Sequence, residues 1–251
     1  METNVHLSRS GPTATITFSA GGKPPTLDHR VLDDLDAHLG TIEGDASIRA
    51  LVVRSDAAKY FVVGANIRAL ETLSEQTAEA WVRHGHAVFD RLAALPVPTI
   101  ARVEGFALGG GLELAMACDL IAATTTARLG LPEAGLGFVP GWGGTHRLPA
   151  RVGAARAKEL VFTGRTLDAA EALAIGLVQT TGDAAAVDAW IAGTIERIIG
   201  GAPGAVAAAK RLLADGASLA TAAEAAATVG RMRDPETSRR VRAFLESRRK
   251  G

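Results

Sequence analysis

The sequence has little cysteine, few aromatic residues and no excess of charge, and each shortage excludes something. Its 251 residues include one cysteine, so no internal disulfide can form. Lys+Arg and Asp+Glu both total 27, and this balance provides no general attraction to nucleic acid. No apolar run reaches the ~20 residues of a membrane span, and the first residues lack the basic-then-apolar order of a secretion signal. These absences predict a cytoplasmic protein that binds neither nucleic acid nor membrane.

What is present is typical of a globular enzyme. A hydrophobic content of 47% over this length predicts one domain, with at most a small C-terminal addition. Strand-like runs at 5–8 and 13–18 surround a Gly-Pro turn and indicate a hairpin. Asp28 is placed to cap a helix that ends near Gly40. Further strands at 50–54, 99–103 and 120–124 alternate with helices, which predicts a mostly parallel sheet.

After Gly164 the pattern becomes helical. Helices are predicted at 167–175, 184–199, 203–215, 218–232 and 235–248, with one possible strand at 177–179. The arginine-rich end of the chain is interpreted as a solvated helix face, because no aromatic residues interleave its charges.

The most informative motif is a glycine turn that runs into a helix. Residues 105–115 read Gly-Phe-Ala-Leu-Gly-Gly-Gly-Leu-Glu-Leu-Ala, with one carboxylate, Glu113, just inside the helix. The first N–H groups of a helix have no intrahelical partner, and they stabilise negative charge that develops on an oxygen. The motif lacks the Gly-Lys-Ser/Thr of a phosphate loop and the spacing of a dinucleotide fingerprint. On the motif alone, a purely structural turn remains an equal alternative to carbonyl chemistry.

Two residues that follow this helix are interpreted as structural. Cys118 has apolar neighbours and no nearby histidine in the sequence, so it is predicted to be buried rather than a nucleophile. Asp119 precedes a predicted strand and is read as a cap or turn residue.

Four segments, in order, resemble the signatures of the crotonase (enoyl-CoA hydratase/isomerase) family: residues 61–67, 105–119, 129–148 and 162–178. The likeness runs from about Val5 to the C-terminal helix. It implies an α/β fold with a crotonase-like ββα superhelix core over residues 1–180, which would hold the CoA thioester site. Residues 181–251 would form a C-terminal helical trimerisation region, and the assembly would be a homotrimer or homohexamer.

The resemblance also assigns roles to individual residues. Ala65 and Gly110 become the two oxyanion-hole residues, whose backbone N–H groups hold the thioester oxygen. Glu113 and Glu133 stand where the family's hydratases have their two catalytic glutamates. A carboxylate pair suits hydration, because one group activates water toward Cβ and the other supplies a proton to Cα. The substrate-binding residues implied are Ala65, Asn66, Ile67, Arg68, Gly110 and Trp142.

Two of these positions depart from the family pattern. Asn66 replaces a usual aspartate, keeping its size but losing its charge. Trp142 stands where hydratases often have a small residue. Two interpretations of its indole stay open: it shortens the acyl pocket, or it packs at the subunit surface.

Other polar residues near the motifs are further candidates for the site. His146 and Arg147 suggest a base and a phosphate clamp, but a histidine at a helix start is more often a polar packing residue, so catalysis is not expected there. Lys23, Arg30 and Arg68 are candidates for the 3′-phosphoadenosine end of CoA, and the sequence does not choose among them.

The function expected is that of an enoyl-CoA hydratase in fatty acid metabolism, which adds water to a 2-trans-enoyl-CoA to give a 3-hydroxyacyl-CoA. CoA is part of the substrate, and neither a metal nor a redox cofactor is expected. The alternatives are an enoyl-CoA isomerase, an acyl-CoA decarboxylase or a noncatalytic acyl-CoA-binding protein. A binder has no use for a costly carboxylate pair in an apolar pocket, which argues against the last of these.

Overall fold

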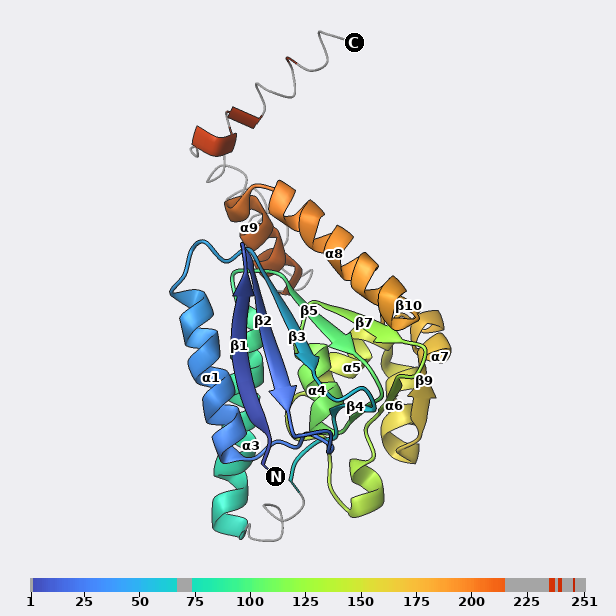
Figure 1. Cartoon of the computed structure of the whole chain (residues 1–251). Helices are drawn as coiled ribbons and strands as arrows, with labels where there is room; N and C mark the ends of the chain where they lie inside the picture. Colours follow the sequence, from blue (N-terminus) through green and yellow to red (C-terminus); the bar gives the residue numbers. More distant parts are fainter. Residues whose placement is uncertain (1, 67–73, 215–234, 238, 241–245, 247–251) are drawn as a thin grey trace.

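The computed structural model describes residues 2–66, 74–214, 235–237, 239–240 and 246 (Figure 1). It contains two β-sheets surrounded by helices. One sheet has six strands in the order β1-β2-β3-β5-β7-β10, and the other has four in the order β4-β6-β8-β9. The mixed α/β architecture predicted from the sequence is confirmed.

The six-stranded sheet begins with a hairpin and continues in parallel. The strands are β1 (Asn4–Ser10), β2 (Thr13–Ser19), β3 (Ala50–Ser55), β5 (Thr99–Val103), β7 (Leu120–Thr124) and β10 (Thr180–Gly182). β1 and β2 are antiparallel, and every later pair in the sheet is parallel, so the predicted hairpin and parallel core are both confirmed.

Helices cover both faces of this sheet. On one face the strands share the main core with α1 (His29–Glu43), α3 (Glu75–Ala94) and α4 (Gly110–Ala117). On the other face Val187 and Ile191 of α8 (Ala184–Gly200) pack on Val52 and Ile100. The two-sided cover explains why every residue of β5 and all but one of β3 are buried, as is usual for parallel strands.

α1 begins where the sequence predicts but ends three residues later. Asp28 is its N-cap and accepts a hydrogen bond from Val31 N at 3.0 Å. The predicted end near Gly40 is wrong, because the helix continues to Glu43 and Ile42 extends its buried face. Gly40 has another reason to lack a side chain: a β-carbon there would lie 3.0 Å from Nη2 of Arg91 on α3.

The four-stranded sheet consists of three short parallel strands and one antiparallel strand. They are β4 (Tyr60–Val62), β6 (Phe106–Leu108), β8 (Arg128–Gly130) and β9 (Thr166–Asp168), of which β9 is antiparallel to β8. β6 is followed by α4, and β8 by the 3₁₀ helix η1 (Glu133–Leu136). These connections position the candidate site.

The region after Gly164 contains two short strands, of which the sequence pattern shows only one, and that one displaced. The helices are α7 (Ala169–Ala174), α8 and α9 (Pro203–Ala214), preceded by α5 (Gly144–Val152) and α6 (Ala154–Thr163). Leu167 was expected in a helix but lies in β9, and α7 starts only after Asp168, which caps it. The strand expected at 177–179 lies three residues later, as β10. The first hydrogen bond from this segment to β7 is donated by Gln179 N to Ile121 O, and pairing continues from Thr180. The helix expected at 218–232, and most of that at 235–248, lie outside the described residues.

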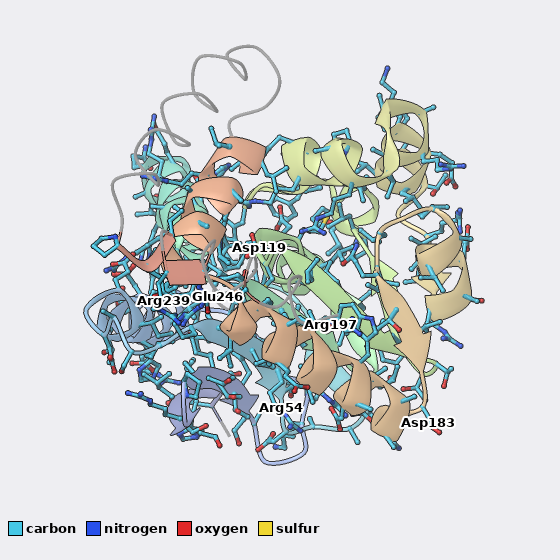
Figure 2. The ribbon with its side chains drawn as sticks, turned by 90° about the horizontal axis from the view of Figure 1, so that it is seen from above. Arg54, Asp119, Asp183, Arg197, Arg239 and Glu246 are labelled. Carbon is cyan, nitrogen blue, oxygen red and sulfur yellow. The ribbon has the colours of Figure 1, made fainter. Side chains whose placement is uncertain are left out.

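Polar contacts attach the C-terminal helices to the core. Asp183 caps α8 by accepting from Ala186 N at 2.8 Å (Figure 2). Lys210 of α9 is nearly buried and lies 2.8 Å from Asp119, which also accepts from Thr99 N at 2.7 Å. The structural role predicted for Asp119 is therefore confirmed. Among the helices of the described ranges, none is long and apolar enough to cross a bilayer.

Candidate active site

Three of the four main candidate residues follow neighbouring parallel strands. Ala65 comes after β4, Gly110 after β6 and Glu133 after β8, and these strands are adjacent in the four-stranded sheet. The carboxyl ends of parallel strands meet at the same edge of a sheet, where α/β proteins commonly bind ligands. The sheet topology thus brings Gly110 close to Ala65, 45 positions earlier in the chain, and to Glu133, 23 positions later.

The two candidate oxyanion segments lie against each other. A β-carbon on Gly64 would stand 3.1 Å from the carbonyl oxygen of Leu108 and 3.4 Å from Gly110 N. Leu27 holds the first segment, since its N–H donates to Gly64 O at 2.9 Å and its carbonyl accepts from Asn66 N at 2.8 Å. Backbone groups on both sides of Ala65 are therefore fixed.

The N–H groups of Ala65 and Gly110 donate no hydrogen bond to any residue in the described ranges. Gly110 is the first residue of α4, where an unpaired N–H and the positive end of the helix dipole coincide. Two unpaired donors on touching segments can both bind one negative oxygen.

Glu113 is buried and held through one oxygen. Its side chain is 2% exposed, and Oε1 accepts hydrogen bonds from Trp142 N and Gly144 N, both at 2.8 Å. Burial raises the pKa of Glu113 to about 7, although the two N–H donors and Arg147 lower it, and Glu133 raises it further. A carboxyl group with this pKa can take or give a proton at neutral pH.

Glu133 faces the same glycine turn from η1. Its Oε1 would lie 2.8 Å from a β-carbon on Gly109, so the glycine leaves room for this carboxyl group. Its Oε2 is buried and has no hydrogen-bond partner among the residues whose placement is known. Burial raises the pKa of Glu133 as well. Buried polar atoms are rarely unpaired, so a water or substrate atom is the expected partner of this oxygen.

Trp142 packs inside its own chain. It is 3% exposed and meets Trp81 and Phe89 edge to face, with ring centroids 5.0 and 5.7 Å apart. Its Cε3 and Cζ3 atoms would be 2.7 Å from a β-carbon on Gly110. The interpretation of the indole as packing at the subunit surface is therefore wrong, because the ring is enclosed between α3 and the start of α4.

The remaining sequence candidates are placed as follows. Asn66 is half-buried next to Ala65, whereas Ile67 and Arg68 lie outside the described residues. Arg30 binds Asp34 at 2.8 Å and the carbonyl of Thr3. Lys23 is exposed in the loop before α1.

His146 and Cys118 are not at the reacting centre. His146 is exposed and stacks on His86, with centroids 5.4 Å apart. Cys118 is 1% exposed, and burial raises the pKa of its thiol to about 12, which confirms that it is a buried residue rather than a nucleophile.

Two contributors to the site were not identified from the sequence. Gly144 N helps to hold Glu113, and Gly85 of α3 makes room for the indole of Trp142. The sequence contains one indication of the role of Gly85. A glycine inside an amphipathic helix costs about 1 kcal/mol of helix stability relative to alanine, so its presence suggests that another group packs closely against it.

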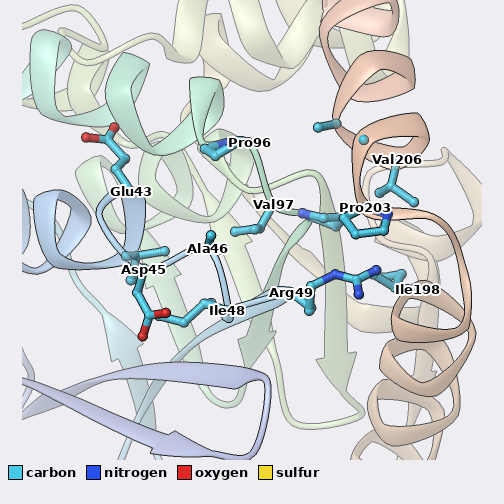
Figure 3. Close-up of a pocket in the computed structure, with 14 residues that line it drawn as sticks. Glu43, Asp45, Ala46, Ile48, Arg49, Pro96, Val97, Ile198, Pro203 and Val206 are labelled. Atoms are coloured by element: carbon cyan, nitrogen blue, oxygen red, sulfur yellow. The ribbon is translucent and has the colours of Figure 1, made fainter. Parts of the chain in front are cut away.

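A second cavity lies elsewhere, at the start of the parallel strands. Its volume is about 260 Å³, and it is formed by the end of α1, the loops before β3 and β5, and the corner between α8 and α9 (Figure 3). None of the candidate site residues lines it. Its charged groups are already bound, since Arg49 donates to Gly201 O at 2.9 Å and Glu43 binds Arg91. It lacks the unpaired donors and carboxyl oxygen of the site described above.

Comparisons with known proteins agree with this geometry. The model of the enoyl-CoA hydratase/isomerase family matches residues 9–250. The short-chain-enoyl-CoA hydratase of Clostridium acetobutylicum is 38% identical over 210 residues, which cover 84% of this chain and 80% of that protein. The mitochondrial methylglutaconyl-CoA hydratase of Rattus norvegicus is 41% identical over 153 residues, covering 61% of this chain and 49% of that protein. The match thus spans about half of the rat protein.

The fold is also found in solved structures. The crystal structure of enoyl-CoA hydratase from Bacillus anthracis superposes with a TM-score of 0.92 at 30% identity, covering 97% of this chain and 96% of that one. The fold, the glutamate pair beside a glycine-led helix and the family match lead to one conclusion. The chain belongs to the enoyl-CoA hydratase/isomerase family.

Proposed function

We propose that this protein hydrates 2-trans-enoyl-CoA thioesters to 3-hydroxyacyl-CoA. The observation that carries the proposal is the placement of Glu113 and Glu133 beside Gly109 and Gly110. The N–H groups of Ala65 and Gly110, next to them, have no partner among the described residues. The hydratase names of the relatives from Clostridium acetobutylicum and Rattus norvegicus support the same reaction.

The site residues have two roles in the reaction: stabilising the thioester oxygen and transferring protons. Ala65 N–H and Gly110 N–H bind the thioester oxygen, where negative charge develops as the double bond is attacked. Loss of one such donor typically costs ~2.7–4 kcal/mol of transition-state stabilisation. Fixed backbone donors need no reorganisation during the reaction, which favours them over mobile side chains.

The two glutamates manage the protons. One carboxylate removes a proton from water while the water oxygen bonds to Cβ, and the electrons of the double bond move toward the thioester. The other carboxyl group gives its proton to Cα, so one water molecule is added in total. Burial raises the pKa of both carboxyl groups, and the charge of Glu133 raises that of Glu113 further. Opposite protonation states at neutral pH are therefore the favoured arrangement. This addition transfers no electrons to an acceptor and polarises the carbonyl through N–H groups, so the proposal needs neither metal nor redox cofactor.

A second carboxyl group distinguishes the proposal from its alternatives. An isomerase or decarboxylase can use the same oxyanion hole with a single acid–base group. A noncatalytic binder gains nothing from Glu133 Oε2, which is buried without a partner in the described part of the chain. Hydration uses both carboxyl groups, one for each proton.

Binding residues and assembly complete the proposal. Asn66, Ile67 and Arg68 follow Ala65 directly and are proposed to contact the CoA part of the substrate. A trimer or hexamer remains a prediction from the resemblance, and a cytoplasmic location remains a prediction from the sequence composition.

The test is a panel of CoA thioesters with the purified protein. Crotonyl-CoA and longer 2-enoyl-CoA esters should lose their enoyl absorbance, and mass spectrometry of the product should show the gain of one water. A 3-enoyl-CoA and a carboxyacyl-CoA serve as substrates for the isomerase and decarboxylase alternatives. Turnover of either of these in preference to every 2-enoyl-CoA would contradict the proposal.

A further inference from the structure

Arg147 lies behind the turn that holds Glu113. Its Nη1 donates to the carbonyl oxygen of Trp142 at 2.8 Å, and the N–H of the same tryptophan donates to Glu113 Oε1 at 2.8 Å. The turn 142–144 therefore binds a guanidinium group on one side and a carboxyl group on the other. The Arg147 side chain is 10% exposed, so water competes little for these bonds.

Gly143 closes the turn around the guanidinium group. Its φ is +110°, a conformation that residues with a side chain rarely adopt, and a β-carbon at this position would overlap Nη1 of Arg147. The arginine thus occupies the space that a side chain at position 143 would fill. Without it, the carbonyl of Trp142 would lose its partner and the turn would lose its packing.

Asp90 of α3 holds Arg147 from the far side. Arg147 Nη2 donates to Asp90 Oδ1 at 2.5 Å, and Asp90 Oδ2 lies 3.1 Å from His86 Nδ1. The contact connects α3 to α5 across 57 positions of sequence. The charges of Asp90, Arg147 and Glu113 then alternate in sign from the surface to the site.

We propose that Arg147 is a positioning residue for Glu113: it fixes the turn 142–144, and so holds one oxygen of Glu113 while the rest of the carboxyl group serves the reaction. This inference rests on the proposed hydratase function. A role in clamping a CoA phosphate is disfavoured, since the donors of Arg147 are used inside the protein by Trp142 and Asp90.

The main variant is Arg147→Met, which removes the charge and the fork of donors but keeps an apolar side chain. A misplacement near 1 Å at a reacting group can reduce turnover by about 10²-fold. We therefore expect kcat on crotonyl-CoA to fall by about 10- to 100-fold, with KM changed much less. In Arg147→Lys, the lysine can bind either Trp142 O or Asp90 but not both in the native geometry. This variant should therefore have a kcat between those of Arg147→Met and the native protein. Asp90→Asn should lower kcat less than Arg147→Met does.

The matched control is Arg151→Met. Arg151 is on the same helix one turn later, and it donates to the carbonyls of Met116 (3.0 Å) and Cys118 without touching the turn 142–144. We expect it to lower the melting temperature while leaving kcat and the pH profile close to those of the native protein. This control separates loss of a buried arginine from loss of the one behind Glu113.

The pH profile supplies a readout that a merely structural role would not move. The groups facing Glu113 are Glu133 from η1 and Arg147 from α5, with Asp90 and His86 of α3 and His146 of α5 around the arginine. Arg147 is the positive charge among the causes that lower the pKa of Glu113. In Arg147→Met the limb of kcat/KM in which Glu113 titrates should move to higher pH, whichever protonation state is active.

A spectroscopic titration separates this inference from the hydratase proposal. Carboxyl ¹³C NMR of protein labelled at glutamate, assigned with Glu113→Gln, reports the titration of Glu113 without any substrate. If the native protein hydrates no 2-enoyl-CoA but Arg147→Met still raises the pKa of Glu113, the hydratase proposal fails and the positioning of Glu113 by Arg147 stands. Native kcat and an unmoved Glu113 titration in Arg147→Met would overturn the role of Arg147, as would effects equal to those of Arg151→Met. Should Arg147→Met not fold, Arg147→Lys and Asp90→Asn decide the matter by the same two readouts.

Discussion

Gly85 and Trp142 fit together so closely that a β-carbon at position 85 would stand 2.7 Å from Cδ1 of the indole and closer still to Nε1. The ring therefore enters the space between α3 and α4 only because position 85 has no side chain. The opposite edge of the ring lies against Gly110, one of the two proposed oxyanion residues. The pair connects packing inside α3 to the geometry of the site.

Gly85→Ala tests this fit. Although alanine favours a helix by about 1 kcal/mol, the added methyl group would push the indole toward Gly110, and overpacking of this kind typically costs 1–3 kcal/mol. We expect lower stability in chemical unfolding and a lower kcat. Gly85→Ala combined with Trp142→Phe should recover both. A single variant as stable and active as the native protein would contradict the close packing.

Trp142→Ala tests whether the indole limits the acyl pocket. Removing the ring should shift preference toward longer acyl chains, by about 1–3 kcal/mol in relative kcat/KM, because pockets discriminate chain length by roughly this amount. The measurement is kcat/KM for 2-enoyl-CoA esters of increasing length. An unchanged profile would disprove the pocket role. The size of the assembly should not change, since the ring is enclosed within its own chain.

The buried Glu113 predicts how stability depends on pH. Its folded pKa, about 7, lies above the ordinary value of 4.5, so the folded protein binds this proton more tightly than the unfolded chain does. The resulting stabilisation is fully present below pH 4.5 and is lost as pH rises through 7, amounting to about 3 kcal/mol in order of magnitude. Glu113→Gln, which does not titrate, should abolish this part of the slope of unfolding free energy against pH. An equal slope in the two proteins would contradict the raised pKa.

The assembly expected from the resemblance is a trimer or hexamer, and closed symmetry of this kind is common among soluble oligomers. Light scattering at micromolar concentration should give a mass three or six times the 25.9 kDa of the chain. A monomer would contradict this expectation without affecting the hydration chemistry, which is proposed from residues of one chain.

Much of the fold follows from the sequence because long periodic segments keep their local preference. The β1–β2 hairpin, α1 with its Asp28 cap and the apolar run of β3 are examples. Of the three-residue strands β9 and β10, the first was missed and the second was expected at 177–179, three residues too early, because such short segments carry little periodic pattern. They are strands only because β8 and β7 present unpaired edges to them.

Some residues of the candidate site could be predicted from the local sequence, and others could not. Gly110 and Glu113 belong to one contiguous motif, so local chemistry suggests them before any fold is known. Glu133 was identified only through the resemblance, because a glutamate after a proline looks like an ordinary turn residue. Arg147 acts through its contact with Asp90 of α3, which no local pattern reports, and Gly85 acts through Trp142, for which a glycine inside an amphipathic helix is the one local indication.

The most direct test of the account compares the native protein with Glu113→Gln and Glu133→Gln. Glutamine keeps the size of each side chain but cannot exchange protons as a carboxyl group does. At position 113 its amide oxygen can still accept the hydrogen bonds from Trp142 N and Gly144 N. Binding of butyryl-CoA, which cannot be hydrated, serves as the control for an intact site. The account predicts that each variant hydrates crotonyl-CoA at least about 10²-fold more slowly while it binds butyryl-CoA as the native protein does. Native turnover in both variants would contradict the two-glutamate mechanism, and impairment of only one would favour an isomerase or decarboxylase.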